Sequence, residues 1–421
     1  MSERGIYIPA EVLTDILSLL PVKTLLRFKC VSKRWLALID SPDFIKLHLS
    51  QSLKKNRNRN LLIGDTFSIH SADFDSLADD LATGVATKLN PPLEGYISAL
   101  AYCNGLLFLS NTLEDNTSTS IIWNPLTREQ QIIHFTPVQH PNGRFYVQIE
   151  AWFGFDSETN DYKVIRVALF CTNYENDDSF QSEVKVYSLK NKMWRDISSC
   201  PYFIRHLKVG GMFVGDALHW IAGTSPRLGT DNLIAAFDLR TEEWRLVPRP
   251  TFKVGNFFMN LAVLGESLCV FSNYFSDFVD IWVMKEYGVE ESWTKICSVV
   301  QSTDICSFEY LKTIAYSKNG KQLLLGQDYF SLRGFDLEKK SVGKAVSLLG
   351  GPINFTSDIF MASLVKLNST TTTSSSEVQI HQNKDQENTK QKTVKKSWCF
   401  KQVEDEIGIR NWRSHDLLIG N

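Results

Sequence analysis

The chain has 421 residues, of which 43% are hydrophobic and 22% charged, and its formal net charge is -2. This length gives room for two or three domains with a sizeable core. The small net charge excludes a global basic field that would favour nucleic acid or an anionic membrane. Residues 1–7 lack a signal-peptide pattern, and no apolar run approaches the roughly 18 residues of a membrane span. We therefore expect a soluble protein of the cytoplasm, the nucleus or both.

The first predicted elements are three short helices in residues 9–44. Residues 9–20 show a one-sided helical pattern with Pro9 in the first turn, and Pro21 ends it. A second helix follows, and Ser32 is placed to cap a third, which residues 40–42 end. The apolar residues expected on these helices are Val12, Leu13, Ile16, Leu17, Leu20, Leu25, Leu26, Phe28, Trp35, Leu38 and Ile39.

Three helices this short cannot bury so many large side chains among themselves. Part of their apolar surface must therefore meet either the rest of the chain or another protein. Two simpler interpretations are a helical cap on the following domain and a helix-turn-helix that reads DNA. The second is disfavoured because Arg27, Lys29, Lys33 and Arg34 are interleaved with apolar residues and leave no separate basic face.

The same stretch carries a family motif. Its residues are Ile8, Pro9, Glu11, Val12, Ile16, Leu17, Leu20, Pro21, Val22, Lys23, Leu25, Arg27, Phe28, Cys30, Val31, Ser32, Lys33, Trp35, Asp43 and Phe44. This series resembles an F-box at nearly every position. The resemblance implies docking onto the Skp-family adaptor of a cullin–RING ubiquitin ligase, and helices with aliphatic anchors suit that kind of contact. By the same resemblance, the adaptor contacts come from Pro9, Leu13, Ile16, Leu17, Leu20, Pro21, Leu25, Val31, Ser32 and Trp35.

A polar, basic stretch follows the F-box, which we place in residues 1–48. Residues 51–60 are typical of the end of a helix that runs into a linker, and we place this linker in residues 49–60. A nuclear import signal is the alternative interpretation of the basic run.

Residues 61–367 are predicted to form strands with a regular repeat. Five turn dipeptides recur at intervals of 50 to 55 residues, at 104–105, 160–161, 215–216, 265–266 and 319–320. Aromatic residues at strand ends recur in phase with them, at Trp123, Tyr187, Phe237, Trp282 and Phe335. A period near 50 is typical of kelch-type β-propellers, and the copies suggest about six blades. A β-sandwich is the alternative, because the intervals vary. The repeated tryptophans are expected to pack between sheets, and His219 with Trp220 to form a half-buried pair on a strand.

Eight stretches of this region also match one family: residues 103–107, 123–125, 154–156, 161–164, 186–189, 215–220, 236–239 and 279–284. They are similar to the F-box-associated domain of plant F-box proteins. The resemblance implies a second domain that selects targets for ubiquitination, through residues that remain unknown. Members act in immune-receptor turnover and in pollen self-incompatibility, and the immune branch looks closer.

The end of the chain differs in composition. Residues 368–396 are rich in Ser and Thr, then in Gln, Lys and Asn, and are predicted to be a disordered linker. Residues 397–421 regain apolar residues and form a short C-terminal tail that could dock back or bind a partner.

Motifs of known chemistry are absent from the sequence. It holds no nucleophile elbow, phosphate loop, zinc-protease motif or dinucleotide fingerprint. Its eight cysteines form no C-x-x-C pair, so no zinc ribbon or RING domain is expected. We expect the cysteines to be free thiols in a reducing compartment. We predict a non-catalytic substrate receptor without cofactor, metal or nucleic acid. The alternatives are a non-degradative scaffold, or a propeller lectin or enzyme with a helical cap.

Overall fold

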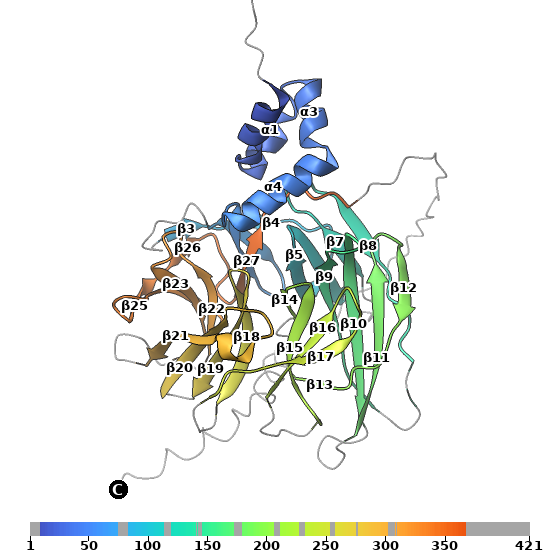
Figure 1. Cartoon of the computed structure of the whole chain (residues 1–421), viewed down its shortest axis with the longest axis vertical. Coiled ribbons are helices and arrows are strands. Elements are labelled where there is room, and N and C mark those ends of the chain that lie inside the picture. The colour runs from blue at the N-terminus through green and yellow to red at the C-terminus, as the bar shows by residue number, and fades with distance from the viewer. Residues whose placement is uncertain are drawn as a thin grey trace, which may run out of the picture. The chain divides into compact units, whose positions relative to one another are not determined.

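The computed structural model describes residues 9–74, 83–112, 119–139, 141, 145–171, 179–205, 211–226, 232–252, 257–274, 277–301, 308 and 310–367. The predicted disordered linker (368–396) and C-terminal tail (397–421) lie outside the described residues. The described chain comprises a helical domain followed by a β-propeller (Figure 1).

Within residues 9–54 the structure describes four α-helices, so the predicted count of three is wrong. They are α1 (Ala10–Ser18), α2 (Val22–Phe28), α3 (Lys33–Ile39) and α4 (Pro42–Lys54). The predicted cap is present, because the Ser32 hydroxyl accepts a hydrogen bond from the Trp35 N–H, 3.2 Å away. Residues 40–42 end α3 but also begin α4. Proline is favoured in a first turn, and the Ser41 hydroxyl accepts from the Phe44 N–H at 3.3 Å.

The connection between the two domains is shorter than the predicted linker. Helix α4 ends at Lys54, and the first strand begins at Arg59. Only residues 55–58 therefore connect them. Of the basic run, Lys54 ends α4, Lys55 and Arg57 are exposed in the connection, and Arg59 is buried at the start of β1.

Six sheets of four or five strands follow among the described residues. Blade 1 contains β27 (Thr356–Met361), β1 (Arg59–Gly64), β2 (Ile69–Asp73) and β4 (Thr87–Leu89). Blade 2 contains β5 (Tyr96–Cys103), β6 (Leu106–Thr112), β7 (Ser120–Trp123) and β8 (Gln130–Ile133). Blade 3 contains β9 (Phe145–Asp156), β10 (Asp161–Cys171), β11 (Phe180–Ser188) and β12 (Met193–Asp196).

The other three blades repeat this order. Blade 4 contains β13 (Phe203–Ile204), β14 (Met212–Val214), β15 (Ala217–Gly223), β16 (Leu233–Asp238) and β17 (Trp244–Val247). Blade 5 contains β18 (Phe258–Leu264), β19 (Ser267–Tyr274), β20 (Phe278–Met284) and β21 (Trp293–Val300), with the 3-10 helix η2 (Glu290–Ser292) before β21. Blade 6 contains β22 (Leu311–Tyr316), β23 (Gln322–Gln327), β24 (Ser331–Asp336) and β25 (Ser341–Ala345). The short strands β3 (Thr83–Val85) and β26 (Ser347–Leu349) pair in parallel.

The ring is closed by a strand from the far end of the described chain. Strand β27 pairs with β1, so that Asp358 lies opposite Leu62. It also contacts β5 and β22, the first strands of the two neighbouring blades, and the first strand of each other blade contacts the next blade in succession. This closed ring makes the alternative β-sandwich wrong.

The predicted sequence repeat corresponds to the blades. Each of the five turn dipeptides joins the first and second strands of one blade, and the glycines at 105, 215, 265 and 320 have the positive φ that such turns favour. The aromatic residue that recurs in phase lies on the third strand. Blade 1 breaks the series because its first strand, β27, comes from the other end of the chain.

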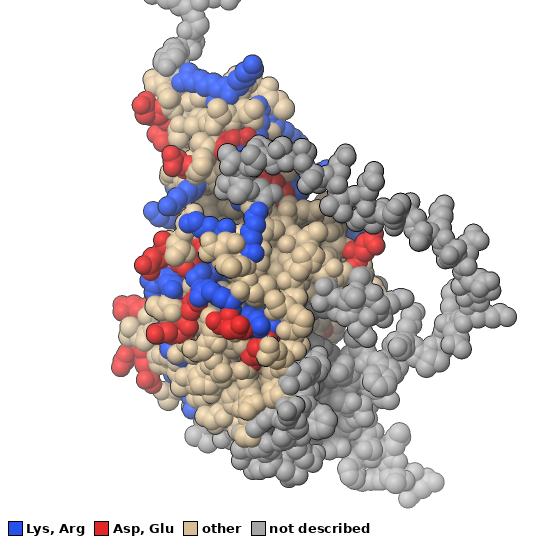
Figure 2. All heavy atoms as spheres, turned by 90° about the vertical axis from the view of Figure 1, so that its right-hand side faces the viewer, with Lys and Arg blue, Asp and Glu red and all other residues tan. Residues whose placement is uncertain are grey.

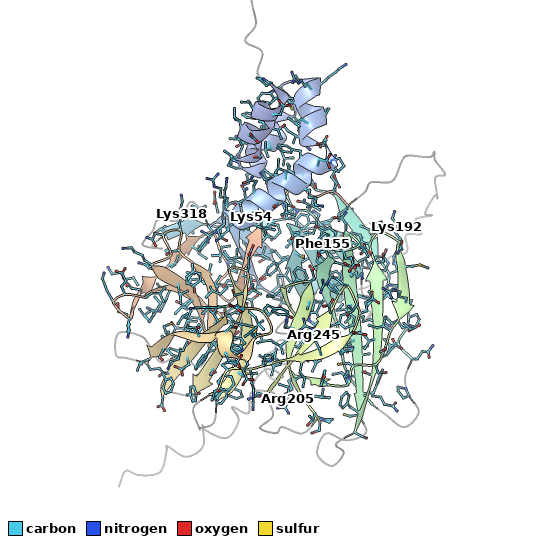
Figure 3. All side chains as sticks on the ribbon, viewed as in Figure 1. Lys54, Phe155, Lys192, Arg205, Arg245 and Lys318 are labelled. Carbon is cyan, nitrogen blue, oxygen red and sulfur yellow. The ribbon has the colours of Figure 1, made fainter. Side chains whose placement is uncertain are left out.

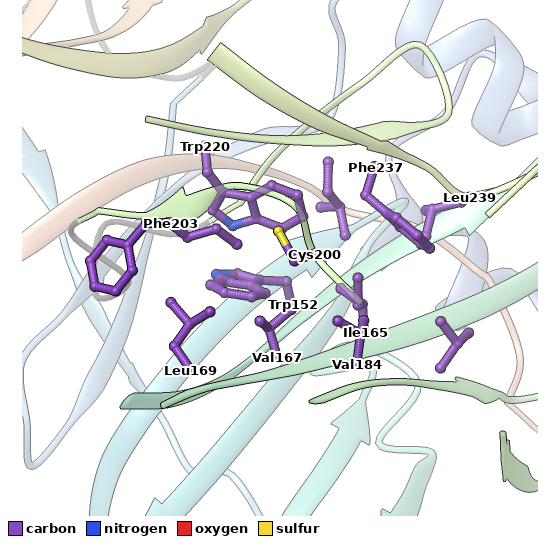
Figure 4. Close-up of a cluster of buried hydrophobic side chains, with 13 residues drawn as sticks. Trp152, Ile165, Val167, Leu169, Val184, Cys200, Phe203, Trp220, Phe237 and Leu239 are labelled. Carbon is purple, nitrogen blue, oxygen red and sulfur yellow. The ribbon is translucent and has the colours of Figure 1, made fainter. Parts of the chain in front are cut away.

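The repeated tryptophans pack between blades, as predicted: Trp194 packs between blades 2 and 3, Trp244 between blades 3 and 4, and Trp293 between blades 4 and 5. Trp152 on β9 and Trp220 on β15 meet edge to face, with ring centroids 4.8 Å apart, in a cluster between blades 3 and 4 (Figure 4). His219 and Trp220 are fully buried rather than half-buried. The reason is that β15 is a central strand of its blade and is covered on both faces.

The propeller has two faces, defined by the direction of its strands. On the proximal face, next to the helices, first strands end and second strands begin; Lys318 and Lys192 lie in turns of this face (Figure 3). On the distal face, first strands begin and second strands end; Arg205 lies there.

Candidate adaptor-binding surface and its anchorage

The helical domain has a small core of its own. Its buried apolar side chains come from all four helices and from a segment that follows β27. They are Leu13, Leu17, Val22, Leu25, Ile39, Phe44, Ala362 and Leu364. Ala362 and Leu364 of the same chain thus cover part of the apolar surface that the short helices cannot bury among themselves.

The structure divides the predicted adaptor-binding residues into three groups. Leu13, Leu17 and Leu25 lie inside this core, and Leu17 is only 1% exposed, so they support the surface without facing a partner. Leu20 and Trp35 are half-buried at its edge, and Trp35 packs edge to face on Phe28. The exposed members are Pro9, Ile16, Pro21, Val31 and Ser32.

An apolar surface remains open on the helices. Val12, Ile16 and Leu19 follow one another along the outer side of α1, and Ile16 is 50% exposed. Val31 and Leu36, at the start of α3, are also exposed. The predicted adaptor contacts do not include the exposed Val12, Leu19 and Leu36. The i, i+4, i+7 spacing of residues 12, 16 and 19 is the sequence signal for the α1 stripe. Figure 2 shows one side of this domain, where charged side chains of both signs surround uncharged surface.

A short segment after β27 joins the helices to the propeller. We call residues 362–367 the C-terminal clasp. The side-chain amide of Asn124, after β7, donates to the backbone oxygens of Ser363 at 3.2 Å and Val365 at 2.9 Å. The Leu367 N–H donates to a carboxylate oxygen of Glu129 at 2.8 Å. The clasp is therefore fixed to blade 2 while Ala362 and Leu364 complete the helical core.

A charged contact ties the clasp to the helices. The carboxylate of Asp40, at the end of α3, lies 2.7 Å from the ammonium of Lys29 and 3.0 Å from that of Lys366. Burial alone would raise the pKa of Asp40, but hydrogen bonds and charge from both lysines outweigh it and lower the pKa below its ordinary value. Asp40 therefore stays ionised and holds α2 and the clasp together.

Helix α4 provides the remaining attachment. Ile45 and Leu49 pack against the apolar cluster between blades 2 and 3. On the same helix, a ring nitrogen of buried His48 lies 2.9 Å from the backbone oxygen of Leu20. Burial lowers the pKa of His48, so its neutral ring links α4 to the end of α1.

Buried titratable groups in the propeller serve packing. His219 lies between the backbone oxygen of Met212 at 2.9 Å and the Tyr287 hydroxyl at 2.6 Å, and Arg245 donates to the same hydroxyl. Burial lowers the pKa of His219 to about 4. It also raises the pKa of Cys269 to about 12. A neutral imidazole and a protonated thiol are poor candidates for acid–base or nucleophilic work at neutral pH.

In the described part of the chain, no group of three or more His, Cys, Asp or Glu side chains could hold a metal ion. Of the helices the structure describes there, none has the length and apolarity needed to span a membrane.

Comparison with protein families decides what these two domains are. Residues 7–47 match the F-box domain, and residues 61–346 match the family described as the F-box associated beta propeller domain. The chain belongs to the F-box proteins with this propeller domain. The two matches cover α1 to α3, part of α4 and strands of every blade, but they end before β26, β27 and the clasp. The strand that closes the ring and the clasp thus lie outside the matched ranges.

Relatives of this F-box protein include proteins of the plant Arabidopsis thaliana. It is 35% identical over 376 residues to F-box protein CPR1 of Arabidopsis thaliana, a match that covers 85% of this chain and 88% of the relative. It is 28% identical to F-box/kelch-repeat protein At3g23880 of the same plant, covering 70% of this chain and 80% of that protein.

Solved structures show weaker likeness. A lectin from Aleuria aurantia aligns with a TM-score of 0.38 at 12% identity, covering 68% of this chain and 90% of that chain. The oligogalacturonate lyase solved with manganese aligns with a TM-score of 0.37 at 12% identity, covering 69% and 74%.

Proposed function

We propose that this F-box protein is the substrate-recognition subunit of a Skp–cullin–F-box ubiquitin ligase. Its F-box binds a Skp-family adaptor, and its propeller binds a target protein for ubiquitination and proteasomal degradation. The observation that carries the proposal is the open apolar stripe of Val12, Ile16 and Leu19 on a small helical domain. Such a stripe suits the helix-in-groove recognition that an adaptor built of helices offers.

The anchorage of the F-box supports the mechanism. A receptor of this kind accelerates transfer by bringing the target's lysines close to the ubiquitin-conjugating enzyme, and its own side chains take no chemical step. That role requires a fixed distance between the adaptor site and the target site. The clasp, the contacts of Asp40 and the packing of α4 hold the F-box on the propeller and so support such a fixed distance.

The accessible members of the α1 stripe are the proposed adaptor contacts. Pro9, Pro21, Val31 and Ser32 are exposed beside them, and Leu20 and Trp35 are partly accessible. The buried Leu13, Leu17 and Leu25 affect adaptor binding indirectly, because they stabilise the core that supports this surface. An interface of ordinary size, about 1,600 Å² in total, would cover this surface.

Capture of a recombinant Skp-family adaptor tests the proposal. Ile16→Asp places an unpaired carboxylate in the contact, which costs about 3 kcal/mol or more, so capture should be lost. Leu246→Asp is the matched control, because Leu246 is an exposed leucine of the propeller. Thermal unfolding of both variants should match the wild type. Equal capture by the wild type and Ile16→Asp would refute adaptor binding through this surface.

The proposal includes a role in plant defence and a location in the cell. Resemblance to plant F-box proteins that act in immune-receptor turnover supports a role in plant defence, in the cytoplasm, the nucleus or both. Candidate immune receptors should persist longer after translation is blocked when the chain carries Ile16→Asp. Unchanged receptor half-lives would leave adaptor binding intact but contradict the defence role.

A further inference from the structure

Strand β11 of blade 3 is longer than the strand that covers its outer edge. It spans nine residues, but only Lys185–Ser188 pair with β12. One more backbone bond follows, in which the Ile197 N–H donates to the Val184 oxygen at 3.1 Å. From there to its distal end at Phe180, β11 extends beyond β12 (Figure 1). We call the outer side of Phe180–Glu183 the open edge.

The sequence after β12 explains why the open edge has no partner strand. In the register of β11 and β12, Ser199 would lie opposite Ser182 and Pro201 opposite Phe180. Proline has no N–H to donate, so it cannot complete this ladder. Instead the Cys200 N–H donates to the Ser182 hydroxyl at 2.7 Å, and that hydroxyl donates to the Cys200 oxygen at 3.1 Å. The segment after β12 is thus bonded to the Ser182 side chain and not to the backbone of β11.

The open edge presents backbone donors and acceptors. In a strand, the N–H and C=O groups of successive residues face the two neighbouring strands in turn. The Val184 oxygen faces outward to Ile197, so the backbone groups of Ser182 and Phe180 also face outward. No residue of the described chain forms a hydrogen bond with these outward groups. A strand edge of this kind can pair with a further strand.

A cavity of about 680 Å³ lies along the open edge, and binding sites usually have roughly 300–1,000 Å³. Every residue from Phe180 to Val184 lines it, and so do Ile197 and Pro201. Side chains 180, 182 and 184 lie on one face of the blade, and side chains 181 and 183 lie on the other. Val184 belongs to the apolar cluster between blades 3 and 4, against which Phe180 and Ile197 pack. One wall of the cavity is therefore largely apolar.

The other wall carries polar side chains, and its charges are paired. A carboxylate oxygen of Glu183 accepts from the Gln139 N–H at 3.1 Å, and the other lies 2.6 Å from the guanidinium of Arg166. Asp196, the second charged residue among the described residues that line the cavity, lies 3.0 Å from the ammonium of Lys185. A charged occupant would lose hydration here without gaining a free counter-charge. The cavity therefore favours uncharged side chains.

We infer that the open edge binds an extended segment of the target protein as an added strand. The segment carries uncharged residues, apolar at every second position and polar between them. Backbone hydrogen bonds to Phe180 and Ser182 hold it, and its alternate side chains meet the two walls of the cavity. The inference rests on the proposed function, because it assumes that the propeller selects a target. The open edge lies at the distal end of blade 3, so an adaptor on the F-box leaves it free.

Peptide selection on the purified full-length chain tests the inference. Random peptides displayed on phage are selected on the wild type, and the enriched sequences should alternate uncharged apolar and polar residues. Synthetic copies of an enriched peptide are then methylated at one backbone nitrogen at a time. Affinity should fall about tenfold or more at every second position, where the N–H faces β11, because a buried acceptor then loses its donor. It should fall clearly less at the positions between.

Two neighbouring serines provide matched variants of the protein. Ser199 and Ser198 are both exposed, but Ser199 lines the cavity and Ser198 does not. Ser199→Trp should obstruct the cavity and lower peptide affinity about tenfold or more, whereas Ser198→Trp should leave it unchanged. Both variants should unfold at the temperature of the wild type, because each changes an exposed side chain.

Further outcomes separate the possible failures. Ile16→Asp should lose the adaptor and keep the peptides, so loss of the proposed function and loss of the inferred site are read independently. Enrichment of charged peptides, no enrichment, a methylation pattern without alternation, or equal affinity for Ser199→Trp and Ser198→Trp would each overturn the inference. Displacement of the selected peptides by a synthetic peptide of residues 397–421 would overturn it as well, because the site would then belong to the chain's own tail.

Discussion

The side-chain amide of Asn124 donates a hydrogen bond to the backbone oxygen of Val365, 2.9 Å away and 241 positions later in the sequence. The same amide nitrogen donates to Ser363, and the amide oxygen accepts from the N–H groups of Leu126 and Thr127. One buried side chain thus fixes the turn after β7 and the clasp that completes the F-box. Through it, the surface proposed for the adaptor and the propeller become one unit.

Asn124→Ala should therefore destabilise the protein. It removes two donated and two accepted hydrogen bonds and leaves buried backbone groups without partners, at a cost of roughly 2–4 kcal/mol. Chemical denaturation measures this difference. Asn191→Ala is the control, because Asn191 is exposed and bonds through its backbone N–H. If Asn124→Ala were no less stable than Asn191→Ala, the clasp would contribute nothing to the fold.

Neighbouring residues on α1 should respond differently to the same substitution. Leu17→Ala opens a cavity in the F-box core and should cost about 2–5 kcal/mol of stability. Ile16→Ala removes an exposed side chain and should change stability by less than about 0.5 kcal/mol, while weakening adaptor capture. Thermal unfolding and capture of the adaptor on the same samples test this. A large loss of stability in Ile16→Ala would show that the stripe is part of the core.

The pH dependence of stability should reveal His219. Its folded pKa, about 4, lies below the ordinary value of 6.5, so the unfolded chain binds a proton first as the pH falls. The contribution is fully present above pH 6.5 and is lost as the pH falls towards 4. Between pH 7 and pH 5 the loss should be about 2 kcal/mol.

His219→Gln provides the comparison for that titration. The variant lacks the titrating ring but keeps His48, whose pKa burial also lowers. Denaturation curves at pH 7 and pH 5 should therefore differ less for the variant than for the wild type. The same pH dependence in both proteins would mean that His219 titrates in the fold with its ordinary pKa.

The sequence was informative where signals are local and repeated. Five turn dipeptides predicted the first hairpins of blades 2 to 6, and Ser32 predicted the start of α3. Helix α4 was not counted, because a proline that ends one helix can also begin the next. The sequence could not show β27 closing blade 1 or Asn124 holding the clasp, since both contacts join residues more than 230 positions apart.

The candidate site shows a related limit. Residues 12, 13, 16, 17 and 19 of α1 are all apolar, so the helical period defines a broad stripe without saying which half faces inward. In the structure Leu13 and Leu17 are buried in the core, whereas Val12, Ile16 and Leu19 are exposed. Which residues are buried depends on packing against the clasp and the other helices, which the helical period does not contain.

Calorimetric titration of the purified full-length chain with a Skp-family adaptor tests the central claim most directly. The wild type should form an equimolar complex, and Val12→Ala/Ile16→Ala should bind more weakly by about 2–3 kcal/mol, or roughly 30- to 150-fold. No binding by the wild type, or the same affinity for both proteins, would contradict the account.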